Sequence, residues 1–360
     1  MKRLLLPILA GIILAACSSP APVEQNRSPE GILAQINSDY FFDKRIWFQD
    51  LSIERDQGRL ILKGETFYPA SVAAAKRILA RAGYENVEAQ VSFLPDTLMG
   101  EGNYGIVNQT KVMGRYRPVT EREEATEMIY GDAVRIVRRG DPFVQIQSPE
   151  GYLCYIPTAS VRRVDLPEWD RYHRGPFSIF TREVELTESV SINMGSRLPY
   201  LGGDRVLLAD GDTLRLGDDS YRIADPDQNP KRKAILETAK GYLGLPYVWA
   251  GRSDDGVDCS GLVIQSLGAN GIFMPRDSDQ MSNVGLLYGF PGWTSALLPG
   301  DICFFTGTRR LVTHTGIYAG NDMVIHSYGG GTQLESWDPE SEVYNPTLKS
   351  DFIFARRVFD

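Results

Sequence analysis

A cysteine at the start of an apolar helix, followed by two histidines on strand-like segments, most constrains the fold of this chain. Cys259 stands in an Asp-Cys-Ser-Gly turn that opens an apolar stretch to about Ala269. His314 begins one strand-like run, His326 ends the next, and a hairpin turn separates them. A helix-borne thiol packed against an antiparallel sheet that carries histidines indicates an α+β fold.

The same three residues have the chemistry of a cysteine peptidase. The backbone N–H groups and the dipole at a helix start favour a thiolate at Cys259. A hairpin brings strand ends together, so His314 would be the base and His326 would orient it, in chain order. The alternative is a buried structural thiol and two core histidines, and spacing alone does not separate the two interpretations.

The N-terminus has the three parts of a secretory signal. A basic start precedes the apolar run Leu4–Leu14, which is shorter than the roughly 20 residues that span a bilayer. The ending Leu-Ala-Ala-Cys-Ser-Ser resembles a bacterial lipobox, which implies that residues 1–16 are a signal peptide and that Cys17 is lipidated. No aspartate follows Cys17, which in that resemblance implies an outer-membrane location facing the periplasm. The alternative is an ordinary signal peptide with an incidental cysteine.

Composition excludes some partners and leaves others open. The chain has 360 residues, a formal net charge of −8 and no basic run, so nucleic acid is not an expected partner. With Cys17 lipidated, Cys154, Cys259 and Cys303 remain, an odd number that leaves at least one free thiol. Cys154 and Cys303 lie in apolar strand-like runs and are predicted to be buried. No zinc-type spacing occurs, so neither a metal nor another cofactor is expected, and nothing indicates an oligomeric state.

The region before Cys259 divides into short segments. Residues 31–97 suggest strand, strand, helix and strand, and faintly resemble a small BON-type envelope domain. Strands at Gly105–Val112, Ala133–Val137, Val144–Gln147 and Tyr152–Ile156, separated by turns, favour a small barrel. This region resembles a bacterial SH3 domain, and a second, weaker copy follows. The predicted organisation is a signal peptide (1–16), a tether (17–30), a small α+β domain (31–97), two SH3-like barrels (98–166 and 167–226) and a catalytic domain (227–360).

Several motifs in the last 130 or so residues resemble one family. They are Tyr-X-Trp-Ala-Gly before Asp-Cys-Ser-Gly-Leu-Val, Pro-Arg-Asp-Ser with a following Gln, Leu-X-Pro-Gly-Asp-Ile-X-Phe-Phe, and His-Thr-Gly-Ile-Tyr. Together they resemble the NlpC/P60 papain-like cell-wall peptidases, and the SH3-like segments resemble the branch that includes γ-D-glutamyl-L-diamino acid endopeptidases. The resemblance implies that Cys259 is the nucleophile, His314 the base and His326 the third member.

The resemblance also implies residues that contact the substrate. Tyr247 matches a tyrosine that lines the site and helps bind the oxyanion, and Tyr152 matches a barrel tyrosine that walls the pocket. Asp258 and Ser260 match residues that bind the L-Ala end of the peptide, although Asp258 also fits a helix cap.

The sequence departs from that branch at one position. Where the branch often has Arg-X-Glu-Pro, with an acid that holds the free amine of L-Ala, this chain has Arg117 in place of the acid. Three explanations stay open. Asp258 holds the amine alone, a nearby acid (Glu121, Glu123 or Glu124) substitutes, or the enzyme accepts longer, glycan-attached peptides.

The expected function is therefore hydrolysis of peptidoglycan stem peptides at the bond between γ-D-Glu and the diamino acid, through a Cys/His/His acyl-enzyme mechanism. Two alternatives remain. The same fold cuts a D,D cross-link or an amide bond, or the chain is a catalytically silent, peptidoglycan-binding scaffold of the envelope.

Overall fold

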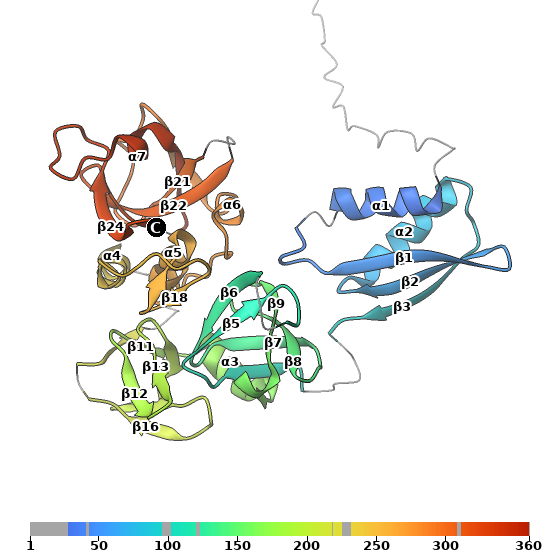
Figure 1. The fold of residues 1–360 in the computed structure, drawn as a ribbon, viewed down its shortest axis with the longest axis horizontal. Helices are drawn as coiled ribbons and strands as arrows, with labels where there is room; N and C mark the ends of the chain where they lie inside the picture. Colours follow the sequence, from blue (N-terminus) through green and yellow to red (C-terminus); the bar gives the residue numbers. More distant parts are fainter. Residues whose placement is uncertain are drawn as a thin grey trace, which may run out of the picture. The chain divides into compact units, whose positions relative to one another are not determined.

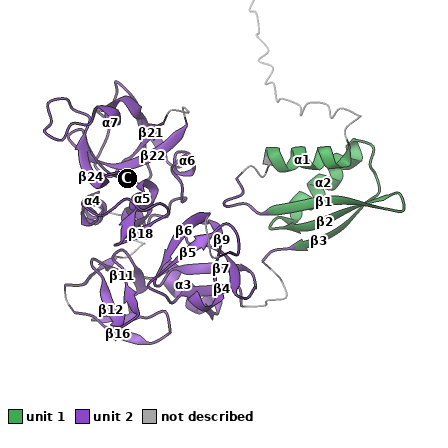
Figure 2. Ribbon diagram, in the orientation of Figure 1, with its two compact units in different colours: residues 1–42, 49–92 green, residues 43–48, 93–360 purple. Residues whose placement is uncertain are grey.

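The computed structural model describes residues 28–40, 43–95, 102–119, 123–217, 219–224, 232–307 and 311–359. Its chain divides into two compact units, residues 1–42 with 49–92 and residues 43–48 with 93–360 (Figure 2). The predicted signal peptide, Cys17 and Glu121 lie outside the described residues. None of the described helices is both long and apolar enough to cross a membrane.

The first unit packs two helices and a sheet, in the order β1-β2-β3, around one core. Its elements are α1 (Pro29–Tyr40), β1 (Gln49–Asp56), β2 (Arg59–Thr66), α2 (Pro69–Arg81) and β3 (Val87–Phe93). The order strand, strand, helix, strand is found as predicted, but α1 precedes it and was missed. Ile32, Leu33 and Ile36 of α1 are buried, because their spacing places them on one side of the helix. The resemblance to BON-type domains stays a prediction.

A seven-stranded sheet begins the second unit. Its order is β10-β4-β7-β8-β9-β5-β6, which brings strands distant in sequence together. The strands are β4 (Tyr104–Val107), β5 (Lys111–Arg115), β6 (Glu124–Ile129), β7 (Ala133–Arg138), β8 (Phe143–Gln147), β9 (Leu153–Pro157) and β10 (Val161–Val164), with a 3-10 turn, η2 (Thr158–Ser160). The single strand predicted at Gly105–Val112 is wrong: a bend at residues 109–110 divides it into β4 and β5.

Three smaller sheets follow the helix α3 (Leu166–Arg174), which Asp165 caps by accepting the Glu168 N–H. The sheets have the orders β14-β11-β17, β12-β13 and β15-β16. Their strands are β11 (Phe177–Phe180), β12 (Val184–Thr187), β13 (Val190–Ile192), β14 (Arg197–Pro199), β15 (Arg205–Leu207), β16 (Thr213–Arg215) and β17 (Tyr221–Ala224). They share a core with Ile106 of β4 and with Tyr130, which lies in the turn after β6. The SH3-like nature of both regions stays a prediction.

The last part of the chain is a six-stranded antiparallel sheet covered by helices (Figure 1). The sheet order is β20-β25-β21-β22-β23-β24. The elements are α4 (Arg232–Gly241), β18 (Arg252–Ser253), β19 (Gly256–Val257), α5 (Cys259–Gly268), α6 (Ser278–Met281), β20 (Leu286–Gly289), β21 (Ile302–Thr306), β22 (Val312–Gly320), β23 (Met323–Tyr328), β24 (Gly331–Ser336), α7 (Pro346–Asp351) and β25 (Phe352–Arg357). Helices α4 and α5 share a core with β21, β22 and β23, so the mixed helix-and-sheet prediction is confirmed.

Candidate active site

Cys259 is the first residue of α5, and its position depends on the residues around it. Asp258 caps the helix by accepting the Gly261 N–H at 2.6 Å. A Cβ at Gly261 would lie 2.2 Å from the carbonyl oxygen of Gly251, so only glycine fits there. The Asp-Cys-Ser-Gly sequence is therefore a cap followed by a close backbone approach, and it fixes the thiol at the helix start.

The protonation state of Cys259 differs from the expectation for a helix start. Burial, reinforced by the charge of Asp258, raises the pKa of the thiol to about 12. The backbone N–H groups of Thr315 and Ser260 and the charge of Arg276 oppose this pKa shift without overcoming it. The resting residue is a thiol, so a base has to take its proton when it reacts.

The two histidines lie on neighbouring strands of the hairpin β22–β23. His314 Nε2 is 2.9 Å from His326 Nδ1, and the backbone N–H of the adjacent Thr315 is hydrogen-bonded to the sulfur of Cys259. A Cβ at Gly316 would lie 2.9 Å from the Cβ of His326, which explains the glycine of His-Thr-Gly-Ile-Tyr. The structure thus brings His314 and His326 together and places Thr315, the neighbour of His314, against Cys259.

The hydrogen bonds fix the histidine tautomers. His326 Nε2 is 2.9 Å from Glu335 Oε2, and a carboxylate only accepts, so His326 donates from Nε2. Its Nδ1 then accepts the Nε2–H of His314, which leaves Nδ1 of His314 unprotonated and available as the base. Burial lowers the pKa of His314 to about 3, so this ring is neutral at pH 7.

Glu335 and Asn345 extend the hydrogen bonds of the two histidines. The sequence analysis predicted neither residue as part of the site. The Asn345 side-chain amide donates to Glu335 Oε2 at 2.5 Å. Glu335 lies on β24, two residues beyond the Gln333 that pairs with His326, and therefore on the same face of the sheet. Recognising β24 as a strand would have pointed to it. Burial lowers the pKa of His326, and the Glu335 carboxylate opposes that shift.

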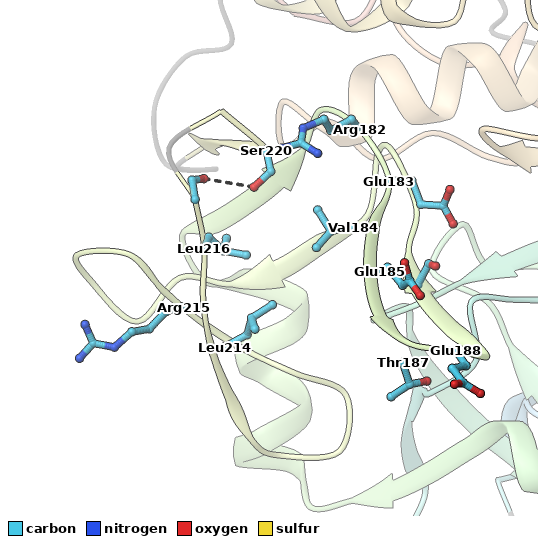
Figure 3. Close-up of a pocket in the computed structure, with 12 residues that line it drawn as sticks. Arg182, Glu183, Val184, Glu185, Thr187, Glu188, Leu214, Arg215, Leu216 and Ser220 are labelled. Carbon is cyan, nitrogen blue, oxygen red and sulfur yellow. Dashed lines mark hydrogen bonds between the residues drawn. The ribbon is translucent and has the colours of Figure 1, made fainter.

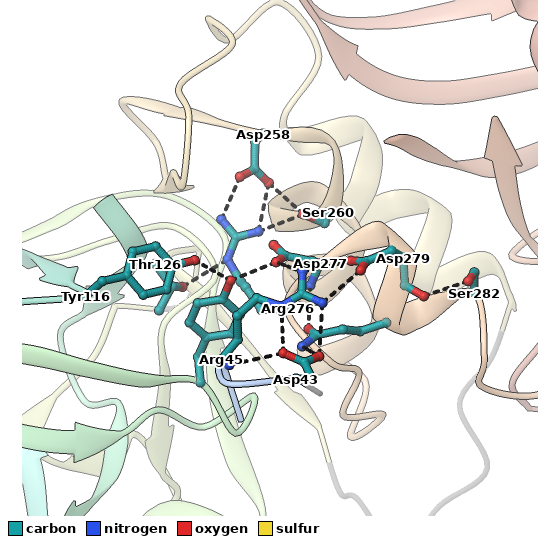
Figure 4. A network of polar contacts seen from close by, with 12 residues as sticks. Asp43, Arg45, Tyr116, Thr126, Asp258, Ser260, Arg276, Asp277, Asp279 and Ser282 are labelled. Atoms are coloured by element: carbon teal, nitrogen blue, oxygen red, sulfur yellow. Dashed lines mark hydrogen bonds and ion pairs between the residues drawn. The ribbon is translucent and has the colours of Figure 1, made fainter. Parts of the chain in front are cut away.

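Asp258 and Ser260, on either side of Cys259, are bound to a buried arginine (Figure 4). Arg276 donates to both oxygens of Asp258, at 3.0 and 2.7 Å, and to Ser260 Oγ at 2.7 Å. Its Nε donates to Thr126 Oγ1 of β6 at 2.9 Å. Each oxygen of Asp258 also accepts a backbone N–H, one from Ala250 and one from Gly261. Asp258 is therefore fully engaged by the chain itself.

Tyr247 and Tyr152 both lie close to this group of residues. Burial, followed by the charge of Cys259, raises the pKa of Tyr247, which is consistent with a hydroxyl near the thiol. The Tyr152 hydroxyl donates to Asp277 Oδ2 at 2.7 Å and is 2.6 Å from the Tyr116 hydroxyl. The sequence analysis predicted neither Asp277 nor Tyr116 as part of the site.

Arg117, at the position of the expected acid, is paired with an acid that follows it closely in sequence. Its side chain is 71% exposed and pairs with Glu123 at 3.0 Å. The cation beside Tyr152 is instead Arg45, which donates to Asp277 Oδ2 at 2.7 Å (Figure 4). No motif pointed to Arg45, because it lies 232 positions before Asp277.

Other groups lie outside this site. Cys154 and Cys303 are free and buried, as predicted. Within the described part of the chain, no group of three His, Cys, Asp or Glu side chains is placed to hold a metal ion. A cavity of about 670 Å³ lies beside β12 and β16, but neither cysteine nor histidine lines it (Figure 3).

Comparison with known proteins agrees with the geometry. Residues 244–357 match the NlpC/P60 family. A γ-D-glutamyl-L-lysine dipeptidyl-peptidase of Bacillus cereus is 31% identical over 214 residues, which are 55% of this chain and 62% of that protein. A probable endopeptidase, NlpC of Escherichia coli, is 34% identical over 127 residues, which are 34% of this chain and 76% of that protein.

Solved structures share the fold. An NlpC/P60 family protein from Bacillus cereus superposes with a TM-score of 0.61 at 21% identity, over 71% of this chain and 100% of that one. An NlpC/P60 endopeptidase from Photobacterium damselae gives a TM-score of 0.54 at 18% identity, over 70% of each chain. This chain spans 62% and 38% of the first two dipeptidyl-peptidases that it matches. The sequence motifs and the fold agree with the match to the E. coli protein, most of whose length is covered. The chain belongs to the NlpC/P60 family.

Proposed function

We propose that this chain is a cysteine peptidase that hydrolyses peptidoglycan stem peptides at the bond between γ-D-glutamate and the diamino acid. The observation that carries the proposal is the His314–His326 pair, together with the hydrogen bond from the backbone N–H of Thr315, the neighbour of His314, to the Cys259 sulfur. The names of the relatives, γ-D-glutamyl-L-lysine dipeptidyl-peptidase and endopeptidase, support the class of bond.

The reaction follows from the tautomers. Nδ1 of His314 takes the proton of the Cys259 thiol as the sulfur attacks the carbonyl carbon, which forms a tetrahedral oxyanion. The backbone N–H of Cys259 and the Tyr247 hydroxyl are suitable donors to this oxyanion. The protonated His314 then gives the proton to the leaving amine as the C–N bond breaks, and a thioester remains. Water, deprotonated by the same nitrogen, releases the acid and restores the thiol.

The other roles rest on the sequence resemblance. Asp258, Ser260 and Tyr152 border the L-Ala end of the peptide, and Asp258 does so while it caps α5. The protein acts in the cell envelope, where a lipid at Cys17 anchors it to the outer membrane and it hydrolyses the cell wall from there. Neither a metal nor a cofactor is needed for the mechanism.

Incubation of the purified protein with L-Ala-γ-D-Glu-diaminopimelate, and with the same peptide attached to its disaccharide, tests the proposal. Mass spectrometry should detect free diaminopimelate or its peptide from at least one of the two. The position of the new amine in digested sacculi distinguishes this bond from a D,D cross-link or an amidase cut. If both peptides stay intact beside an active family member, the proposed activity is wrong.

Exchange of Glu335 for glutamine tests the orientation of the two histidines. The glutamine amide can either accept a hydrogen bond from His326 Nε2 or donate one to it. In a fraction of the molecules His326 is therefore protonated on Nδ1, where it cannot accept from His314. We expect kcat to fall by about 10- to 100-fold, with KM changed less than twofold. Steady-state kinetics on the cleaved peptide measure both constants.

Glu340→Gln is the matched control, because this carboxylate is exposed and does not contact a histidine. It should leave both constants unchanged. Equal kinetics for the Glu335→Gln variant and the unaltered protein would show that His326 needs no carboxylate partner.

The pH dependence of kcat/KM follows from the pKa of the base. Since burial lowers the pKa of His314 to about 3, the base remains unprotonated well below pH 6.5. Activity is lost only when this nitrogen is protonated, so kcat/KM should change less than about twofold between pH 7 and pH 5. For a base with the ordinary histidine pKa of about 6.5, kcat/KM would fall roughly 25-fold over the same range. Measuring kcat/KM for an N-acylated peptide from pH 4 to 8 distinguishes a base with the lowered pKa from one with the ordinary pKa.

A further inference from the structure

Tyr328, the last residue of β23, lies against the base of the proposed mechanism. The register of β22 and β23 pairs Ile317 with Ile325. Continued toward the start of β22, this register places Tyr328 across from His314, on the same face of the sheet. The two ring centroids are 5.5 Å apart and the ring planes meet at 69°, an edge-to-face contact. Tyr328 therefore contacts the imidazole of the base directly.

Tyr328 is the exposed member of the group of rings around His314. Phe305 and His326 also contact the His314 ring, at centroid distances of 5.4 and 5.1 Å. Phe305 is 2% exposed and His326 is 5% exposed, whereas Tyr328 is 66% exposed. The two residues that follow Tyr328 are glycines, which have no side chain to cover its ring. An aromatic surface is therefore open to solvent immediately beside the base.

Hydrogen bonds hold this end of the hairpin against the segment that leads to the nucleophile. Ser327 Oγ donates to the carbonyl oxygen of Val257 at 2.8 Å, two residues before the reactive cysteine. The Thr332 N–H, on the following strand, donates to the carbonyl oxygen of Leu245 at 2.8 Å, two residues before the tyrosine proposed to bind the oxyanion. Tyr328 lies between these two anchored residues in sequence, so its position relative to that segment is fixed.

The pKa of Tyr247 is consistent with this placement. Burial is the largest cause of its raised pKa, and the charges of Cys259 and Asp258 follow. Arg276 opposes the shift, and the charge of Tyr328 adds to it. Because Coulombic effects weaken with distance, the Tyr328 hydroxyl belongs to the surroundings of Tyr247.

The leaving amine of the substrate has to approach the same imidazole. In the proposed reaction Nδ1 of His314 gives its proton to that amine, which requires about 3 Å between the two nitrogens. The diamino acid attached to the amine then extends beyond the imidazole, past the side chains that border it. Since Phe305 and His326 are buried, the ring that such a group meets from solvent is Tyr328.

We propose that Tyr328 contacts the substrate and binds the diamino acid on the leaving side of the scissile bond. The side chain of a diamino acid is a run of methylenes that ends in an amino group. Methylenes gain from covering an aromatic face, and an ammonium is attracted to it. The inference rests on the proposed function and adds the leaving side of the site, for which the sequence resemblance supplied no residue.

The test compares kcat/KM for two substrates that share the acyl part L-Ala-γ-D-Glu, in the form (free or attached to its disaccharide) that the protein cleaves. One carries diaminopimelate, and the other carries a γ-methyl ester that has no side chain to bind. Tyr328→Ala should lower kcat/KM by about tenfold for the peptide and by less than about twofold for the ester. Tyr328→Phe keeps the ring and should retain most of the activity on the peptide.

Leu286→Ala is the matched control. Leu286 is also 66% exposed and belongs to the same sheet, but three strands separate its strand β20 from β23. Both substrates should be hydrolysed by this variant as by the unaltered protein. A further measurement needs no variant: the unaltered protein should cleave the peptide with diaminopimelate at least about fivefold faster, in kcat/KM, than the same peptide with glycine in that place.

An equal loss on peptide and ester in Tyr328→Ala would overturn the inference, because Tyr328 would then act only by orienting His314. Unchanged kinetics of this variant on both substrates would overturn it too, as would equal cleavage of the diaminopimelate and glycine peptides by the unaltered protein. If the unaltered protein hydrolyses the diaminopimelate peptide in neither form, the proposed function itself is wrong.

Discussion

Replacing Cys259 with alanine is expected to lower kcat for the stem peptide by about 10⁴-fold or more. The mechanism has one nucleophile, and neither of the other described thiols can replace it. Cys154 is 1% exposed and Cys303 is 0% exposed, so no peptide reaches them. Product formation followed by mass spectrometry measures the loss, and the peptide should still bind, because the alanine variant retains Asp258, Ser260 and Tyr152.

Cys154→Ala is the control for this experiment. It removes a buried thiol of the seven-stranded sheet and should keep most of the activity. Intact-mass labelling with a thiol reagent gives an independent measurement, in which Cys259 should react before Cys154 and Cys303. If the unaltered protein binds stem peptide but never turns it over, and the Cys259→Ala variant behaves identically, the chain is a scaffold instead of a peptidase.

Replacing Arg276 with methionine should have the largest effect on stability. The Arg276 side chain is 1% exposed and its partner Asp258 is 7% exposed, so the change leaves a buried carboxylate without a counter-charge. Loss of one partner of a buried ion pair typically costs about 3–5 kcal/mol. Urea denaturation, followed by tryptophan fluorescence, should therefore show a clearly lower midpoint, and the activity should fall because Asp258 also caps the helix of Cys259.

Two further variants identify the cause of that loss. Arg215→Met removes an arginine that is 78% exposed and lies 3.6 Å from Asp204, and should cost under about 1 kcal/mol. The double variant Arg276→Met with Asp258→Asn removes the unpaired charge and should recover part of the lost stability. Equal destabilisation by Arg276→Met and Arg215→Met would contradict the importance of the buried pair.

The parts of the fold and of the site that could be predicted from the sequence are those determined by residues close together in the chain. The helix of Cys259 begins at a capping aspartate, and the hairpin of His314 and His326 follows from two strand-like runs with a turn between them. Prediction from local pattern failed at the first helix and at one bend of the chain. α1 was missed because it follows a polar segment, and β4 and β5 were merged because the bend at residues 109–110 carries neither glycine nor proline.

The contacts that were not predictable join polar residues far apart in sequence. Glu335 reaches His326 from a strand that was not recognised, and Arg45 reaches Asp277 across 232 positions. A charged residue on a loop has no periodicity, so nothing in the sequence marks its partner. The thiolate expected for Cys259 failed for a related reason, because the burial that raises its pKa comes from the whole fold.

The placement of residues 43–48 has a consequence for how such chains are inherited. The sequence alone suggests a module at 31–97 that recombination could exchange between proteins without affecting the peptidase. The second unit, however, takes Asp43–Phe48 from within that stretch. A change to the module would thereby also remove contacts of the seven-stranded sheet, because Ile46 packs on the core of that sheet and the carbonyl oxygen of Arg45 accepts the Leu153 N–H.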